Sequence, residues 1–244
     1  MTSTQYQTWS LEDNPLPKLS IIIPTFNESK NLPSLLSNLL EMGNESEIII
    51  VDCDSQDKTK EISSLYGAKV YNSPLKNRGF QLNYGSKKAK GEWFCFIHAD
   101  SRLKKGWSKE IKQVMKKNYR YIYFFRFRVN SKKVFYKLLE YVVNVRGFLF
   151  KTPYGDQGLL ISRENYIKTG GYQPLPIMED IDFIKRIKEK KVKLKPLENP
   201  MYTNSRKWER VNFIFQAFKN WRLRQRWSQG ESLEKIYEEY YKVR

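Results

Sequence analysis

Short apolar runs alternate with helical stripes through the first half of the chain. Residues 19–24 (LSIIIP), 47–52 (EIIIVD) and 92–97 (EWFCFI) are rich in β-branched or aromatic residues, which is typical of buried strands. A further strand is predicted at 68–71, and helices at 58–66, up to about 90, and at 107–117. Between the first two runs, leucines recur at intervals of three and four, which predicts an amphipathic helix: Leu32, Leu35, Leu36, Leu39 and Leu40.

This alternation predicts an α/β fold, in which helices flank a mostly parallel central sheet on both faces. Ligands of such sheets bind at the carboxyl ends of the strands. We therefore expect the informative side chains at 25–28, 52–57 and 98–100, which follow three of the predicted strands.

The pattern changes in the second half. Residues 121–129 (YIYFFRFRV) end in alternating Phe and Arg, as expected for a strand with one wet face. A helix is predicted from there to about residue 150, another at 180–190, and a strand at 192–197. The tail from Trp208 onward is predicted to be helical and basic, with Ile214, Phe218 and Trp221 on one stripe.

We divide the chain into three segments. We expect residues 1–18 to form a polar extension, residues 19–200 the main α/β domain, and residues 201–244 a basic helical C-terminal segment that packs on the same domain. No apolar run approaches the ~18 residues that a membrane-spanning helix needs. The two cysteines, Cys53 and Cys95, lack a CxxC or Cys/His cluster, so we expect a reducing cytoplasm rather than a disulfide framework.

The net charge of the chain limits the classes of binding partner but does not identify one. The 244 residues carry a formal net charge of +18. Such a charge favours phosphate-bearing ligands, anionic membranes or nucleic acid. The Trp and Arg residues between Trp221 and Trp227 suit a membrane interface, so attachment to the inner face of the membrane is one interpretation. The simpler one is that the lysine pairs and this helix are solvated surface.

Acidic side chains gather where the predicted strands end. Asp52, Asp54 and Asp57 follow the second long run, and Asp100 follows the third. Transfer from a nucleoside diphosphate needs a divalent cation with hard oxygen ligands, a general base for the acceptor hydroxyl, and cations for the leaving group. Each aspartate alone is also explained as a helix cap or turn residue, and the pair at 179–180 as the acidic first turn of a helix.

The ordered set of motifs is more specific. SIIIPTFNE (20–28), VDCDSQDKT (51–59) and FIHAD (96–100) resemble the family-2 glycosyltransferases of the GT-A fold. NRGFQLNYG (77–85), PYGDQGLLISR (153–163) and GGYQPLPIMEDIDFIKRIK (170–188), with SRKWER (205–210), are similar to a small bacterial subfamily associated with radical-SAM and selenoprotein-type gene clusters. The resemblance covers roughly residues 19 to 240.

The resemblance implies a Rossmann-like GT-A fold and an inverting transfer from a nucleotide-sugar donor, with UDP as the guessed nucleotide, to a hydroxyl acceptor that is a small molecule or lipid-linked. It implies Mg²⁺ or Mn²⁺ at Asp100 and Asp180 as the general base. On the acceptor side it places Asp156, Gln157, Glu179 and Trp208. On the nucleotide-sugar side it places Thr25, Asn27, Glu28, Asp52, Arg78, Gln81 and Arg206.

Two positions depart from the family pattern. His98 stands where the family at large has the first Asp of its DxD metal motif, as in the smaller subfamily, so the metal rests on one carboxylate, the diphosphate and water. Cys53 and Asp54 replace the usual small or acidic pair, which leaves the role of Asp54 open.

Two other classes remain as alternatives. A nucleotidyltransferase of related fold would need a Gly-rich loop after the first strand, where this chain has PTFNE (24–28). A basic nucleic-acid-binding protein would explain the charge but has no use for carboxylates at the strand ends. We therefore expect no specific nucleic acid among the partners.

Overall fold

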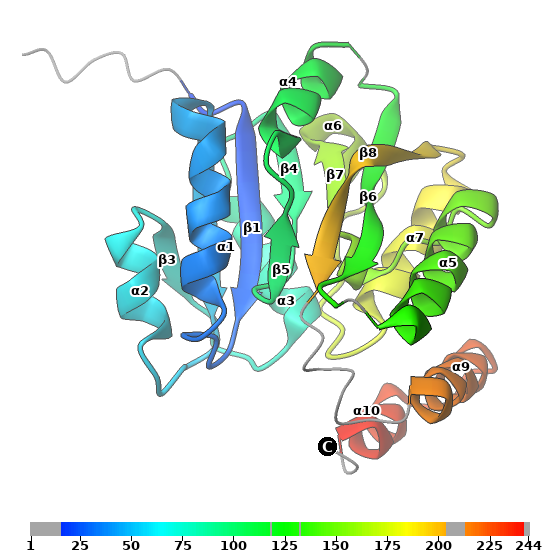
Figure 1. The fold of residues 1–244 in the computed structure, drawn as a ribbon. Coiled ribbons are helices and arrows are strands. Elements are labelled where there is room, and N and C mark those ends of the chain that lie inside the picture. The colour runs from blue at the N-terminus through cyan, green and yellow to red at the C-terminus, as the bar shows by residue number, and fades with distance from the viewer. Residues whose placement is uncertain (1–15, 118, 132, 204–212, 242–244) are drawn as a thin grey trace, which may run out of the picture.

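An eight-stranded sheet forms the centre of the molecule (Figure 1). The computed structural model describes residues 16–117, 119–131, 133–203 and 213–241. The strand order is β3-β2-β1-β4-β7-β6-β8-β5, with β7 antiparallel to both of its neighbours and β5 antiparallel to β8. The strands are β1 (Leu19–Thr25), β2 (Ser46–Asp52), β3 (Lys69–Asn72), β4 (Trp93–Phe96), β5 (Ser101–Leu103), β6 (Tyr121–Val129), β7 (Leu159–Ser162) and β8 (Lys193–Thr203).

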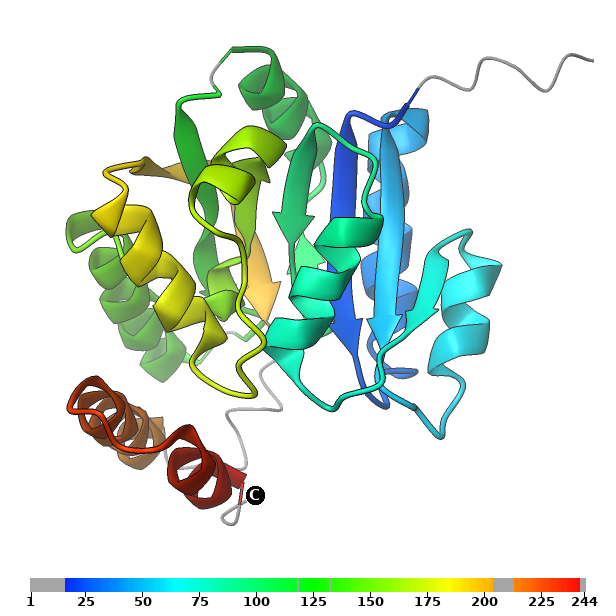
Figure 2. The same cartoon turned by 180° about the vertical axis from the view of Figure 1, so that it is seen from behind.

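Helices cover both faces of this sheet (Figures 1 and 2). Side chains of α1 and α4 pack on one face with alternate residues of β1, such as Ile21. Side chains of α3, α6 and α7 pack on the other face with Ile22. The helices are α1 (Leu32–Leu39), α2 (Thr59–Leu65), α3 (Arg78–Lys88), α4 (Trp107–Lys117), α5 (Val134–Leu149), α6 (Arg163–Lys168), α7 (Glu179–Glu189), α9 (Phe213–Ser228) and α10 (Leu233–Tyr241), with 3₁₀ turns η1 (Leu40–Glu45) and η2 (Gly155–Gln157). The expected α/β fold is confirmed.

Several elements differ from the sequence prediction. The short β5, β7 and α6 were not predicted, because three to six residues are too few to show a period. The predicted strand at 192–197 continues as β8 to Thr203. It therefore ends three residues past residue 200, where we placed the end of the main domain. Pro196 and Pro200, which argue against a strand in the sequence, lie where the pairing of β8 with β6 shifts register.

The C-terminal helices lie below the carboxyl ends of the strands in both views (Figures 1 and 2). Leu223 of α9 and Ile236 of α10 are fully buried, and they pack against Ile177 and Met178. These two residues directly precede α7, so the tail is attached to the segment that leads to Glu179 and Asp180.

Among the described residues, no helix is both long enough and apolar enough to cross a membrane.

Candidate functional site

The end of β2 is tied to the end of β1 by a buried carboxylate. Asp52 is fully buried and accepts hydrogen bonds from the Thr25 hydroxyl at 2.8 Å and from the Ser55 N–H at 2.9 Å. The Ser55 hydroxyl donates to the same carboxylate at 2.6 Å and accepts from the Asn27 N–H. Because these bonds use both carboxylate oxygens, Asp52 sets the shape of the loops at this edge of the sheet.

The loop after β1 completes this rim. Asn27 has φ of +53°, a conformation that Asn tolerates better than most residues, and its side chain accepts from the Gln56 N–H at 2.8 Å. The Glu28 N–H donates to the Thr59 hydroxyl, and its carboxylate accepts from the Asn31 side chain. The predicted nucleotide-binding residues of both loops therefore lie side by side.

Gln81 lies beneath this rim rather than on it. Its side chain is buried and donates to the carbonyl oxygens of Thr25 at 3.0 Å and Val51 at 2.7 Å. The amide thereby satisfies two strand-end carbonyls, which would be costly to bury unpaired.

Arg78 reaches across to Glu179, which was predicted to lie on the acceptor side. Its guanidinium pairs with the carboxylate of Glu179, which is buried. Burial raises the pKa of Glu179 above its ordinary value of 4.5, Arg78 works against this shift, and the neighbouring Asp180 adds to it. The second oxygen of Glu179, Oε2, is buried without a hydrogen-bond partner in the described structure.

A strained turn places Glu179 and Asp180. Met178, the residue before α7, has φ of +65°, which is unfavourable for a long side chain. The contacts of Met178 with the C-terminal helices hold this conformation. On the other side, Gly79 of α3 lies so close to the approaching loop that an added Cβ would lie 2.2 Å from the Gln173 carbonyl oxygen.

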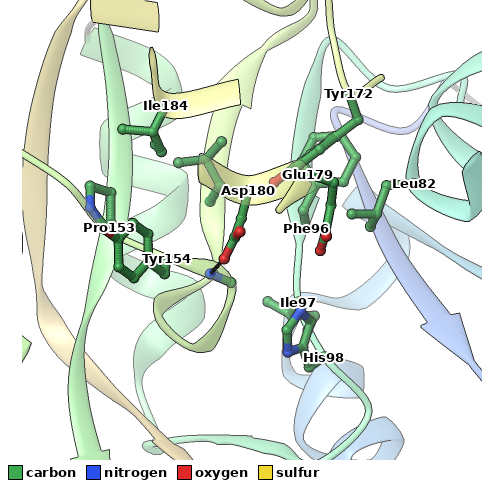
Figure 3. Close-up of a pocket in the computed structure, with 13 residues that line it drawn as sticks. Leu82, Phe96, Ile97, His98, Pro153, Tyr154, Tyr172, Glu179, Asp180 and Ile184 are labelled. Atoms are coloured by element: carbon green, nitrogen blue, oxygen red, sulfur yellow. Dashed lines mark hydrogen bonds between the residues drawn. The ribbon is translucent and has the colours of Figure 1, made fainter. Parts of the chain in front are cut away.

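Asp180 lines a pocket between α7 and the segment before β7 (Figure 3). Its Oδ2 accepts from the Gly155 N–H at 2.9 Å and its Oδ1 from the Ile181 N–H at 2.8 Å. Other residues of the wall are His98, Tyr154, Tyr172 and Glu179. The two N–H groups orient the carboxylate and leave each oxygen able to accept another hydrogen.

His98 faces this pocket rather than serving only as a strand-end residue. Its Nδ1 lies 3.9 Å from Oδ1 of Asp156. An added Cβ on Gly155 would come within 2.7 Å of the imidazole Cε1, so this position has room only for glycine while the ring keeps its place. Gln157 is fully buried; its side chain donates to the Phe125 carbonyl at 3.3 Å and accepts from Arg146. Asp156, also predicted on the acceptor side, is more exposed than Gln157.

Asp100, the predicted metal ligand, has a half-buried side chain. The described residues contain no group of three or more His, Cys, Asp or Glu side chains placed to hold a metal ion. Arg102 lies near Asp100 and Glu28; burial lowers the pKa of this arginine, and the two carboxylates partly offset that effect. One hard oxygen ligand fits Mg²⁺ or Mn²⁺ only if most other ligands come from a bound diphosphate and water.

Two arginines lie beside the pocket: Arg146, which was not predicted to have a role, and Arg224, which was predicted only within the membrane helix. The guanidinium carbons of Arg146 and Arg224 lie 3.9 Å and 5.1 Å from the ring centroid of Tyr154. Burial lowers the pKa of Arg146, and the charge of Arg224 adds to that shift. No local spacing links these residues, because they come from α5 and α9.

Several predicted residues take other places. Arg206 and Trp208 lie outside the described residues. In the proposed membrane helix, Arg226 pairs with Glu231 and Glu239. Trp227 packs in the cluster between α9 and α10. Trp221 is 50% exposed, so it is the tryptophan of this helix that is open to a partner.

A family comparison agrees with this geometry. The model of "Glycosyl transferase family 2" matches residues 20–174. A 4,4'-diaponeurosporenoate glycosyltransferase of Staphylococcus haemolyticus is 28% identical over 182 residues, which are 71% of this chain and 47% of that protein. A dolichol-phosphate mannosyltransferase of Pyrococcus furiosus is 41% identical over 92 residues, or 34% of this chain and 26% of that protein. The chain thus spans about half of the first relative and a quarter of the second.

Solved structures share the fold at low identity. S. aureus TarS in complex with UDP-GlcNAc has a TM-score of 0.63 at 21% identity, over 77% of this chain and 58% of that one. A mannosyltransferase of Pyrobaculum calidifontis in complex with GDP-Man and Mn²⁺ has a TM-score of 0.57 at 18% identity, over 87% and 61%. With a family model that covers more than half of its length, this chain belongs to glycosyl transferase family 2.

Proposed function

We propose that the protein transfers a sugar from a nucleoside-diphosphate donor to a hydroxyl acceptor with inversion at the anomeric carbon, and that Asp180 is the general base. The observation that carries this proposal is the orientation of Asp180 in the pocket wall by the Gly155 N–H. A carboxylate held in this way accepts a proton from a hydroxyl within hydrogen-bond reach.

The chemistry balances in one step. The acceptor oxygen forms a bond to the anomeric carbon while the bond from that carbon to the diphosphate breaks. The hydroxyl proton passes to Asp180, and the electron pair of the broken bond leaves with the diphosphate. Glu179 Oε2, which has no hydrogen-bond partner among the described residues, would accept from a second substrate hydroxyl. No covalent intermediate with the protein is needed.

The donor lies, in this proposal, along the rim formed by Thr25, Asn27, Glu28 and Asp52. Arg102 and Arg146 bring positive charge near the two ends of the site. Asp100 would hold Mg²⁺ or Mn²⁺, which would supply charge to stabilise the leaving diphosphate. Neighbouring structures bound to UDP, UDP-GlcNAc or GDP-Man, some with Mn²⁺, support a donor of this class. UDP remains our choice, and the HAD form of the motif favours the small bacterial subfamily.

The acceptor is a hydroxyl compound, either small or lipid-linked. The names of two relatives refer to 4,4'-diaponeurosporenoate and to dolichol phosphate, and these names support a lipid-linked acceptor. Attachment to the inner face of an anionic membrane belongs to the same proposal.

A stability screen tests the donor class. A ligand that binds only the folded protein raises the melting temperature. We expect one or more UDP-sugars to raise it, and to raise it further with Mn²⁺. Sugar nucleotides that leave the melting temperature unchanged at every concentration, with and without metal, would contradict the proposal. The unliganded protein with Mn²⁺ alone is the control.

A further inference from the structure

Helix α5 has an apolar face with no partner in the described structure. Six of its side chains are between 53% and 83% exposed, and they recur at helical spacing along one side: Val134, Leu138, Tyr141, Val142, Phe148 and Leu149. We call them the α5 stripe. Single exposed apolar residues are ordinary, but a continuous row of this length marks a surface for interaction.

The opposite side of the helix already packs on the sheet. Tyr136 and Leu139 form a buried cluster with Phe127 and Val129 of β6. Glu140 is buried on this side and pairs with Arg128. The stripe therefore lies on the side of α5 that faces away from the sheet, and no other described segment buries it.

The charges around the stripe indicate the partner. Lys133 is exposed at its start, Lys137 is exposed and pairs with the buried Glu140 at 3.4 Å, and Lys151 follows its end. The only acidic residue of α5 is Glu140, which is buried. Two copies of α5 placed face to face would bring lysines together without an exposed carboxylate on either helix. An anionic lipid surface offers both the apolar layer and the opposite charge.

The helix that carries the stripe also contributes a residue beside the Asp180 pocket. Arg146 of α5 and Arg224 of α9 both stack on Tyr154, which lines the pocket with Asp180. Both views place α9 next to α5 (Figures 1 and 2), and on α9 the exposed Phe218 and Trp221 have ring centroids 5.7 Å apart. Aromatic rings of this kind suit the boundary between headgroups and acyl chains.

We propose that the α5 stripe seats on an anionic bilayer and brings the Asp180 pocket to its surface, so that the acceptor hydroxyl belongs to a membrane amphiphile. The acceptor part of this inference rests on the proposed function, whereas the docking surface is argued from the α5 stripe itself.

Vesicle flotation tests the docking with a matched pair of variants. The α5 variant is Leu138→Ser, Val142→Ser and Leu149→Ser, at positions 60%, 53% and 66% exposed. The control variant is Leu40→Ser, Leu65→Ser and Ile167→Ser, at positions 57%, 84% and 70% exposed on other elements. Both remove three exposed aliphatic side chains, so a general change in solubility would affect both.

We expect the wild type and the control to float with vesicles of phosphatidylcholine and phosphatidylglycerol. The partition coefficient of the α5 variant should be at least about tenfold lower. Circular dichroism should show all three proteins folded. Docking is overturned if the α5 variant floats like the wild type, or if the wild type fails to float. Docking is also overturned if light scattering shows that the wild type is a dimer that does not float and that the α5 variant is a monomer.

Nucleotide binding separates this inference from the proposed function. All three proteins should bind UDP with Mn²⁺ equally in calorimetry, since none of the substitutions lies in the pocket. Flotation without nucleotide binding would overturn the donor assignment alone. With the donor established, labelled sugar should enter the chloroform phase when vesicles contain a bacterial lipid extract. Label found only on water-soluble products would overturn the acceptor class and leave docking intact.

Discussion

Oδ2 of Asp180 accepts a hydrogen bond from the backbone N–H of Gly155 at 2.9 Å, across 25 positions of the sequence. This bond joins the start of α7 to the turn before β7. It distinguishes Asp180 from an ordinary residue of a helical first turn, because only Oδ1 bonds to an N–H of its own helix while Oδ2 reaches the turn at Gly155 (Figure 3).

Replacing Asp180 with Asn tests its role as the base. Asn keeps the size of the side chain and an oxygen for the Gly155 N–H, but it cannot take up the acceptor proton. We expect turnover to fall by roughly two to four orders of magnitude. Donor binding by calorimetry and the melting temperature should stay near the wild-type values, because the lost interaction belongs to the transition state. Near-normal turnover at saturating acceptor would remove Asp180 from the mechanism and make Asp156 the next candidate.

Asp100→Ala tests the metal site. The described residues contain no metal-binding cluster, so removal of this carboxylate should leave only the diphosphate and water as ligands. We expect the Mn²⁺-dependent part of UDP affinity to be lost while the melting temperature without ligand stays unchanged. Calorimetric titration of UDP with and without Mn²⁺ measures both quantities. Equal gains from Mn²⁺ in mutant and wild type would place the metal elsewhere.

Gly155→Ala tests the contact between the turn and His98. The new methyl group would lie 2.7 Å from the imidazole Cε1, so the ring or the turn must move. We expect turnover to fall about ten- to hundredfold, the usual effect of a small displacement in a catalytic group.

A double variant identifies the cause of this loss. If the clash with His98 is responsible, Gly155→Ala should cost far less activity when His98 is already Ala. Additive losses in the two single variants and the double variant would instead show that the methyl group acts directly on the substrate or on Asp180, whose Oδ2 it would approach to 3.5 Å.

Glu140 gives a prediction for pH. Burial alone would raise the pKa of this carboxyl, but the Val129 N–H at 3.0 Å and the Arg128 guanidinium at 2.5 Å hold it below its ordinary value of 4.5. The unfolded chain thus binds the proton more tightly than the folded one. The stabilisation is complete above about pH 4.5 and is lost as the pH falls through the lower folded-state pKa.

Glu140→Gln should therefore lower the free energy of unfolding at pH 7 by about 1–3 kcal/mol, since a buried charged hydrogen bond is lost. The difference from the wild type should shrink as the pH falls below 4.5. Urea unfolding curves at several pH values measure this trend. A difference that stays constant down to the acid transition would show that packing rather than charge accounts for the loss.

The apolar pattern by itself determined most of the fold. Runs such as 19–24 and the leucine stripe from Leu32 carry the strand and helix periods within a few residues, so their structure follows from local information. The family motifs, which also lie within short segments, identified the glycosyltransferase class, and the family model confirms it. The short β5 and the end of β8 were not predicted, because their pairing depends on strands far away in the chain.

Only the tertiary structure decided which side chains meet. The sequence placed Arg78 and Glu179 on different sides of the site, whereas the fold pairs them across 101 positions. Gln81 and Asp52 were predicted to bind the nucleotide because their side chains are polar. In the fold, these side chains form hydrogen bonds with the backbone at the strand ends. The α5 stripe is invisible to a pattern of apolar residues, because α5 is apolar on both sides. One of those sides is buried against β6, and no local sequence pattern predicts which side stays exposed.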